Sequence, residues 1–350
     1  MRITFLAPCK DLSGGIKVIA AYGNLMHERG HAVTVIYPNR SQPVMRTLRK
    51  SLKRILARER DHLDDFSGVL IATDSINEHT IPDADVIIAT AWETAEWVQD
   101  LPESKGKKVY FIQGHEVWNA PKDRVYETLR YPFKKITIST WLRDLVAEIS
   151  GDPNIELIPN ASDHTLESFD TNGSTRPFDV GMTYSSIPNK GATIGLEALN
   201  RIKKRFPSAR FILFGSERPD VDLPENCEFH ERPPQSQISQ IYRQTKIWIS
   251  TSYEEGFCLP CLEAASSGSA VISTDNKGVR DIIEHEKSGY ITETGSVQAL
   301  EYYLTKLLQS DDLLTRMQKA AYTRSKVFSW KDSGDRLDRI LKELVGAPLT

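Results

Sequence analysis

The sequence lacks a long hydrophobic run. The apolar stretch nearest the N-terminus, Ile3–Ala7, runs into Pro8 and Lys10 and is too short for the core of a signal peptide. No other run approaches the roughly 18 apolar residues that a membrane span requires. We therefore expect a soluble protein that stays in the cytoplasm.

Cysteine is scarce, and neither sign of charge dominates. Four cysteines in 350 residues do not make a disulfide framework, and they suit a reducing compartment. Lys and Arg number 44 against 47 Asp and Glu, which excludes a protein that binds nucleic acid by its overall charge. With 40% hydrophobic residues the chain can bury a core, and at about 150 residues per domain its length favours two domains.

Short β-branched runs alternate with helical patterns along most of the chain, which is typical of parallel sheets built from βαβ units. We therefore predict an α/β fold with two doubly wound sheets. The strands predicted in the first half are Arg2–Ala7, Ala32–Tyr37, Val69–Ala72, Val86–Thr90, Val109–Ile112, Ile136–Ser139 and Glu156–Ile158. Those in the second half are Asp179–Met182, Phe211–Phe214, Cys227–Phe229, Ile247–Ser250, Ala270–Ser273 and Tyr290–Ile291. Ligands of such sheets bind outside the carboxyl ends of the strands.

A polar stretch, Ser162–Pro177, separates the two series and is the best candidate for a linker. It predicts a first domain over residues 1–165 and a second over 166–328. The tail after Phe328 returns to a helical pattern, with apolar residues spaced for one face of a helix.

The segment Ser250–Gly268 reads as the end of a strand, a glycine-containing turn and a helix that opens near Pro260. The amides and positive end of such a helix suit an anion such as a phosphate. Glu255 and Glu263 flank the turn with a spacing of eight. A plainer interpretation is that the two carboxylates only favour the helix N-terminus.

The run from Glu255 to Glu263, EGFCLPCLE, resembles the nucleotide-sugar signature of family 4 of the retaining glycosyltransferases, which have the GT-B fold. The resemblance implies two Rossmann-like domains that face each other across a cleft, with residues 329–350 crossing back to the first domain. It implies that Glu255 contacts the donor sugar and that Glu263 binds the ribose. It places the donor diphosphate against Gly256, Phe257, Cys258 and Leu259.

The Cys258-Leu259-Pro260-Cys261 run also looks like a thioredoxin-type motif at a helix start. Such a motif belongs near the start of a small domain, whereas this one falls late in a second α/β domain. Packing against the helix is therefore the expected role of both thiols.

Lys190-Gly191 lies between a predicted strand and the predicted helix Ala192–Arg205. A lone Lys before a Gly usually caps a surface helix. In the resembling family, a Lys-Gly at this place supplies an ammonium group to the diphosphate, commonly with an Arg several residues earlier. That Arg is missing here, so a hydroxyl of Tyr184, Ser185 or Ser186 is a candidate to replace it at the diphosphate.

The family resemblance extends to weaker elements elsewhere in the chain. A Gly14-Gly15 pair follows the first strand and lacks the G-x-G-x-x-G spacing of a dinucleotide fingerprint. In the resembling family a Gly-Gly loop at this place faces the donor phosphates, which implies the same role for Gly14 and Gly15. His115 is expected to touch the donor sugar, although a lone His is often structural. The region that binds the base is placed at Gly215, Ser216 and Arg232. The acceptor region is placed at Thr90, Trp92, Gln113 and Glu116.

The stretch Arg40–Arg60 holds eight basic residues and one acid above an apolar stripe at helical spacing. It predicts either a solvated surface helix or an interfacial helix on an anionic membrane surface. The second interpretation would suit a lipid-linked acceptor and a peripheral position on the inner face of the membrane.

The sequence thus predicts a retaining hexosyltransferase that moves a hexose or deoxyhexose from a nucleotide-diphosphate sugar to a glycan or lipid-linked acceptor, in cell-surface polysaccharide synthesis. Segments around Thr90 and Ser139 loosely resemble the bacterial rhamnosyltransferase branch of family 4. The resembling family works without a metal ion, and neither a metal ion nor a cofactor is predicted. The alternatives are a nucleotide-sugar epimerase of the same fold and a non-catalytic subunit that binds the nucleotide sugar.

Overall fold

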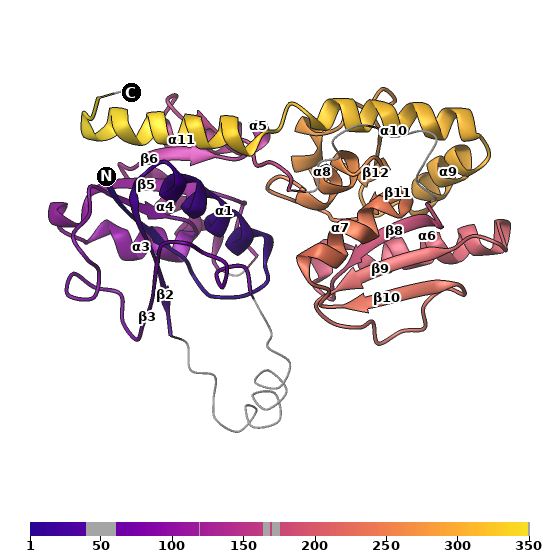
Figure 1. Cartoon of the computed structure of the whole chain (residues 1–350), viewed down its shortest axis with the longest axis horizontal. Helices are drawn as coiled ribbons and strands as arrows, with labels where there is room; N and C mark the ends of the chain where they lie inside the picture. The colour runs from indigo at the N-terminus through magenta and orange to yellow at the C-terminus, as the bar shows by residue number, and fades with distance from the viewer. Residues whose placement is uncertain (40–60, 119, 164–168, 170–175, 349–350) are drawn as a thin grey trace, which may run out of the picture. The chain divides into compact units, whose positions relative to one another are not determined.

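The computed structural model of the chain is shown in Figure 1 and describes residues 1–39, 61–118, 120–163, 169 and 176–348. It divides into two compact units, one of Met1–Pro159 with Trp330–Thr350 and one of Asn160–Ser329. The sequence placed these boundaries after residues 165 and 328. The basic stretch Arg40–Arg60 lies outside the described residues, so both interpretations of it stay predictions. In the described part of the chain, no helix is long and apolar enough to cross a membrane.

The first unit is built on a parallel sheet in the order β3-β2-β1-β4-β5-β6-β7. Its strands are β1 (Arg2–Leu6), β2 (Ala32–Pro38), β3 (Val69–Thr73), β4 (Val86–Ala89), β5 (Lys107–Ile112), β6 (Lys134–Thr137) and β7 (Glu156–Leu157). Its helices are α1 (Gly14–Glu28), α3 (Trp92–Gln99), α4 (Lys122–Arg130), α5 (Thr140–Ser150) and α11 (Trp330–Val345). Successive strands are added on one side of β1 up to β3 and on its other side from β4 onward. Ligands of open α/β sheets bind at such a switch point, here between β1 and β4.

The helix α11 packs on α1 within this first unit. Tyr22 of α1 meets the ring of Trp330 edge-on, with 5.4 Å between ring centroids. Arg29, just after α1, pairs with Asp335 at 2.6 Å. Leu337 and Leu341 form the buried stripe that the helical spacing predicted. The last helix of the chain therefore completes the unit that begins at Met1.

The second unit repeats the design with the strand order β10-β9-β8-β11-β12-β13, again all parallel. Its strands are β8 (Phe178–Tyr184), β9 (Phe211–Gly215), β10 (Cys227–Glu231), β11 (Thr245–Ser250), β12 (Ala270–Thr274) and β13 (Tyr290–Thr292). Its helices are α6 (Ala192–Arg205), α7 (Gln235–Arg243), α8 (Leu259–Ser266), α9 (Val297–Leu308) and α10 (Asp311–Ser325). Here the switch point lies between β8 and β11.

Every strand predicted from the sequence is present, with ends that differ by a few residues. The central strands are apolar on both faces because helices cover both sides of each sheet, as β12 illustrates with all its residues buried. The predicted α/β class with two doubly wound parallel sheets is confirmed.

Candidate functional site

Two predicted site residues meet at the carboxyl ends of β8 and β11. Lys190 lies in the loop between β8 and α6, and Glu255 in the loop between β11 and α8. The Lys190 Nζ atom lies 2.7 Å from Glu255 Oε1, and the Ser252 hydroxyl donates to the same oxygen at 2.7 Å. Burial favours the neutral amine of Lys190, but the charge and hydrogen bond of Glu255 outweigh it and raise the lysine pKa. The pair is thus a fixed cation and anion.

Hydrogen bonds join these two loops to each other. Tyr253 N–H donates to Asn189 O at 2.8 Å, and the Thr251 hydroxyl donates to Lys190 O at 3.0 Å. Gly191 follows with φ of 60°, and a Cβ there would lie 2.2 Å from Thr251 O. Only glycine permits both this approach and this left-handed conformation, so it fixes where Lys190 stands.

Helix α8 begins directly after this pair. Cys258 is its N-cap residue with φ of 68°, and Pro260 occupies the first turn, where a missing N–H costs nothing. The positive end of α8 and the Lys190 ammonium thus belong to the same strand-end loops. This is the arrangement that binds a phosphate group. The predicted diphosphate residues Gly256, Phe257 and Leu259 lie in this turn.

Glu263 points into the second unit from the first turns of α8. It is 7% exposed, and its Oε2 accepts a hydrogen bond from the Tyr242 hydroxyl at 2.9 Å. Sequence reasoning anticipated the position of this carboxylate but not its bond to Tyr242, which comes from a different helix. Its predicted role at the ribose stays a prediction.

The loop after β12 brings a cation that the sequence reasoning missed. Lys277 forms an isolated β-bridge with Glu255, and its Nζ pairs with Glu254. The neighbouring Asn276 carbonyl accepts the N–H of Glu255 at 2.9 Å. A signal was present, because Lys277-Gly278 follows a predicted strand as Lys190-Gly191 does.

The residues predicted for the base lie together beyond β9 and β10. Arg232 donates its backbone N–H to Gly215 O at 2.8 Å and its Nε to Ser216 O at 2.8 Å. Nearby, the hydroxyl of Ser186 donates to Glu217. Ser186 is thereby engaged by a carboxylate, which weakens the idea that it replaces the missing Arg beside Lys190.

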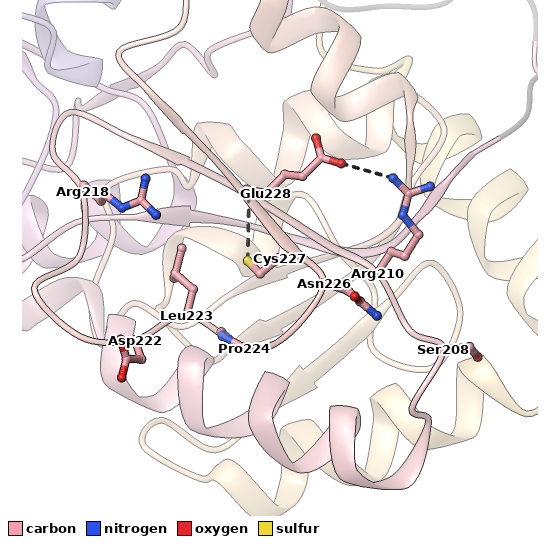
Figure 2. Close-up of a pocket in the computed structure, with 9 residues that line it drawn as sticks. All are labelled: Ser208, Arg210, Arg218, Asp222, Leu223, Pro224, Asn226, Cys227 and Glu228. Carbon is pink, nitrogen blue, oxygen red and sulfur yellow. Dashed lines mark hydrogen bonds and ion pairs between the residues drawn. The ribbon is translucent and has the colours of Figure 1, made fainter.

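A pocket of the second unit lies elsewhere, at the amino ends of its strands (Figure 2). Arg210 and Cys227 stand at the starts of β9 and β10, and Arg210 pairs with Glu228 across it at 3.1 Å. None of the residues predicted for the donor lines this pocket. The Arg210 guanidinium is thus already paired with a carboxylate, and the pocket lies away from the candidate site.

In the first unit, predicted residues also gather at the carboxyl edge of the sheet. Gly14 begins α1 after Ser13, and a Cβ on Gly15 would lie 3.7 Å from the Gln113 side-chain nitrogen. Gln113 in turn reaches Thr90 O at 3.5 Å. The ends of β1, β4 and β5 thus contribute to one edge, as expected for a switch point.

Glu116 and His115 follow β5 at this edge. Glu116 Oε2 accepts the Trp92 N–H at 2.8 Å, at the start of α3. Burial raises the pKa of Glu116 to about 7, against the effect of that hydrogen bond. His115 Nε2 lies 3.2 Å from the Tyr126 hydroxyl, and its ring meets Trp141 edge-on.

Two residues predicted for the acceptor region are buried in the first unit. Thr90 is 3% exposed, and its hydroxyl donates to Leu6 O at 2.6 Å. Trp92 is 6% exposed, and the Arg124 guanidinium stacks 4.8 Å from its ring. Both side chains hold neighbouring strands and helices, so Gln113 and Glu116 are the stronger candidates for ligand contacts.

Residues 167–324 match the family model described as glycosyl transferases group 1. This range covers a little under half of the chain, which is therefore similar to group 1 glycosyl transferases within its second unit. The matched range includes the β8–α6 and β11–α8 loops, and hence Lys190, Glu255 and Glu263.

Curated relatives share this domain over part of their length. A D-inositol 3-phosphate glycosyltransferase of Corynebacterium jeikeium is 32% identical over 113 residues, which cover 32% of this chain and 27% of the relative. The GtfA subunit of a UDP-N-acetylglucosamine–peptide N-acetylglucosaminyltransferase of Streptococcus pneumoniae is 25% identical over 236 residues, or 64% of this chain and 44% of the relative. The matches thus span less than half the length of these relatives.

The whole chain resembles HepE of Anabaena, whose structure was solved in complex with UDP-glucose. The TM-score is 0.78, with 98% of this chain and 100% of that chain covered and 16% sequence identity. At that identity the likeness shows the fold alone, and it confirms the GT-B fold expected from the sequence.

Proposed function

We propose that this group 1 glycosyltransferase chain transfers a hexose or deoxyhexose from a nucleotide-diphosphate sugar to a glycan or lipid-linked acceptor, with retention of anomeric configuration and without a metal ion. The observation that carries the proposal is the Lys190–Glu255 pair beside the start of α8. A cation and a helix N-terminus at one strand edge suit the diphosphate of such a donor and the charge that develops on it. A carboxylate at the same edge suits the sugar hydroxyls.

The chemistry follows from where charge builds up. Breaking the bond between the sugar and the diphosphate leaves negative charge on the departing phosphate oxygens. Lys190 and the amides at the start of α8 are positioned to stabilise that charge, and Lys277 adds a second ammonium group where the family Arg is missing. Fixed donors of this kind are effective because they need no reorganisation during the reaction.

Retention favours attack from the face that the diphosphate leaves, with the departing phosphate taking up the acceptor proton. Glu255 is then a binding group for the sugar hydroxyls, and Glu263 and Arg232 serve the ribose and the base. The relatives support a uridine donor, since HepE was solved with UDP-glucose and the GtfA enzyme is named for UDP-N-acetylglucosamine. The same relatives lend no support to the rhamnosyltransferase resemblance.

On the acceptor side we assign Gln113 and Glu116 to hydroxyl groups of the acceptor, and Gly14, Gly15 and His115 to the donor. An acceptor in cell-surface polysaccharide synthesis would fit this edge, which offers carboxyl, amide and aromatic groups. Contact of Arg40–Arg60 with an anionic membrane surface, which would suit a lipid-linked acceptor, and a peripheral cytoplasmic position belong to the same proposal.

The test compares two ion pairs of the second unit. Lys190→Ala and Glu255→Gln should each lower transfer from a UDP-sugar by a factor on the order of 10²–10³, because each removes a group aimed at the donor. Lys246→Ala is the matched control, since Lys246 pairs with Asp179 at a similar distance, 2.8 Å, but near the amino ends of β11 and β8. Near-normal turnover of either site variant would contradict the site assignment.

The alternatives are separated by omitting the acceptor. A panel of UDP, GDP and dTDP sugars, screened by thermal shift, identifies the donor because a ligand at about 100 times its dissociation constant adds roughly 2.7 kcal/mol. Conversion of that donor alone into an epimer would favour an epimerase. Donor binding with neither hydrolysis nor transfer would favour a binding subunit.

A further inference from the structure

Two cysteines meet at the start of α8. Cys258 is the N-cap residue and Cys261 lies three positions later, and side chains at these two positions of a helix face each other. Their Sγ atoms are 3.0 Å apart. The start of α8 therefore holds the two sulfur atoms close to each other.

The surroundings of Cys258 stabilise a thiolate. Ser250 Oγ lies 3.5 Å and Asn276 Nδ2 lies 3.4 Å from its Sγ atom, and the positive end of α8 is adjacent. The hydrogen bond with Cys261 is the largest of the effects that lower the pKa of Cys258, while burial raises the pKa of Cys261. By contrast, burial raises the pKa of Cys227 in the same unit to about 12.

We propose that Cys258 and Cys261 form a reversible disulfide, with a peroxide as the oxidant, and that this bond switches off the donor-binding turn. Both thiols are buried, at 3% and 0% exposure, so a small oxidant reaches them more readily than a protein disulfide. The second half of the proposal rests on the proposed function, whereas the disulfide does not.

The chemistry balances with hydrogen peroxide. The Cys258 thiolate attacks one peroxide oxygen, which gives a sulfenic acid and releases hydroxide that is protonated to water. The Cys261 sulfur then attacks Cys258 Sγ, forms the S–S bond, and the sulfenic oxygen leaves as a second water. The two thiols lose two electrons, and the peroxide is reduced to two waters. A dithiol such as dithiothreitol reverses the reaction by exchange.

The bond would disturb the site through Asn276. This residue links the two groups, because its side chain contacts Cys258 Sγ while its carbonyl accepts the N–H of Glu255. A covalent bond draws Cys258 Sγ toward Cys261 and away from Asn276. The disulfide also removes the negative charge on Cys258 that hydrogen bonds from Asn276 and Ser250 would stabilise. The turn that carries Glu255 must therefore adjust.

The first measurement is chemical. After hydrogen peroxide treatment of the full chain, the peptide containing both cysteines should lose about 2 Da, and dithiothreitol should restore its mass. Cys227→Ser is the matched control and should behave as wild type, whereas Cys261→Ser should stop at a sulfenic acid. Direct overoxidation of Cys258, or no change at either thiol, would overturn the proposal.

The second measurement is the affinity for UDP-glucose, titrated calorimetrically before and after oxidation. Oxidised protein should bind on the order of tenfold more weakly and recover with dithiothreitol, a typical size for coupling between sites. In Cys261→Ser, where no disulfide can form, the affinity for UDP-glucose should not fall tenfold on peroxide treatment. Equal affinity of the two forms would overturn the switch. If the reduced protein binds none of the nucleotide sugars, the proposed function fails, while the mass measurement still decides the disulfide.

Discussion

The carboxyl edges of the two sheets are built from different chemistry, although the sheets share one design. In the second unit the edge carries ion pairs, Lys190 with Glu255 and Lys277 with Glu254, on loops that bond to one another. In the first unit it carries an amide, a partly buried carboxyl and aromatic rings, as Gln113, Glu116 and Trp141 illustrate. We propose that the edge of the second unit binds phosphates and that the edge of the first unit binds hydroxyl groups.

This difference explains why one half was easier to interpret. Phosphate recognition needs a helix start and a nearby cation, and the β11–α8 loop supplies the helix start and its carboxylates within one short run of sequence. Hydroxyl recognition can be met by many side chains from distant loops. The edge of the first unit therefore has no compact signature.

The largest effect should come from the loop that fixes Lys190. Gly191→Ala forces a Cβ against Thr251 O in a left-handed backbone, so we expect a loss of about 2 kcal/mol or more of stability. Gly151→Ala in the first unit is the matched control, since its φ is 70° with no atom within 4 Å, and it should cost only about 1 kcal/mol. Urea unfolding measures both, and equal losses would show that the Gly191 contact is not tight.

Lys277 tests whether the phosphate edge depends on more than its recognised motif. Lys277→Ala should lower transfer by about tenfold, which is less than Lys190→Ala. The Lys190 ammonium contacts Glu255, the residue assigned to the donor sugar, whereas the Lys277 ammonium pairs with Glu254. The exposed Lys287, paired with Glu284 three residues earlier, provides the control variant Lys287→Ala. Steady-state kinetics with varied donor should show the change in KM, and wild-type values would remove Lys277 from the site.

Glu116 tests the other edge through pH. Its pKa is about 7 in the folded protein against an ordinary value of 4.5 for a glutamate, so between these values the folded state holds more protons than the unfolded state. Stability should therefore fall as pH rises through this window, and the full penalty remains above pH 7. Glu116→Gln should remove that fall and be the more stable form at high pH.

The control for this pH experiment is Glu148→Gln, on an exposed position of α5 in the same unit. It should leave the dependence of the unfolding midpoint on pH unchanged. If the unfolding midpoint of the wild type matched that of Glu116→Gln at every pH, the raised pKa of Glu116 would be contradicted.

The smallest effects should come from exposed arginine pairs, one in each unit. Arg124 contacts Glu96 through two nitrogens at 2.7 Å, and Arg280 contacts Asp275 in the same way. Both lie in water, where ion pairs contribute little, so Arg124→Ala and Arg280→Ala should unfold within experimental scatter of wild type. A clear loss for Arg280 alone would show that stability, too, is concentrated at the phosphate edge.

The sequence by itself determined the strands, the alternation that makes two parallel sheets, and the placement of Gly14, Lys190 and Glu255 at strand ends. These are local properties, because apolar runs, turn residues and helix starts are encoded over short distances. It also determined which thiols share a helix start.

Only the tertiary structure decided which of these residues meet. The contact of Lys190 with Glu255 joins loops 65 positions apart, and the bond from Tyr242 to Glu263 joins two helices. Lys277 escaped notice because the carboxylate with which it pairs, Glu254, lies 23 positions away in the loop after another strand. Burial decided the protonation of Glu116, since a carboxyl titrates according to the solvent and charges around it, and these are set by packing.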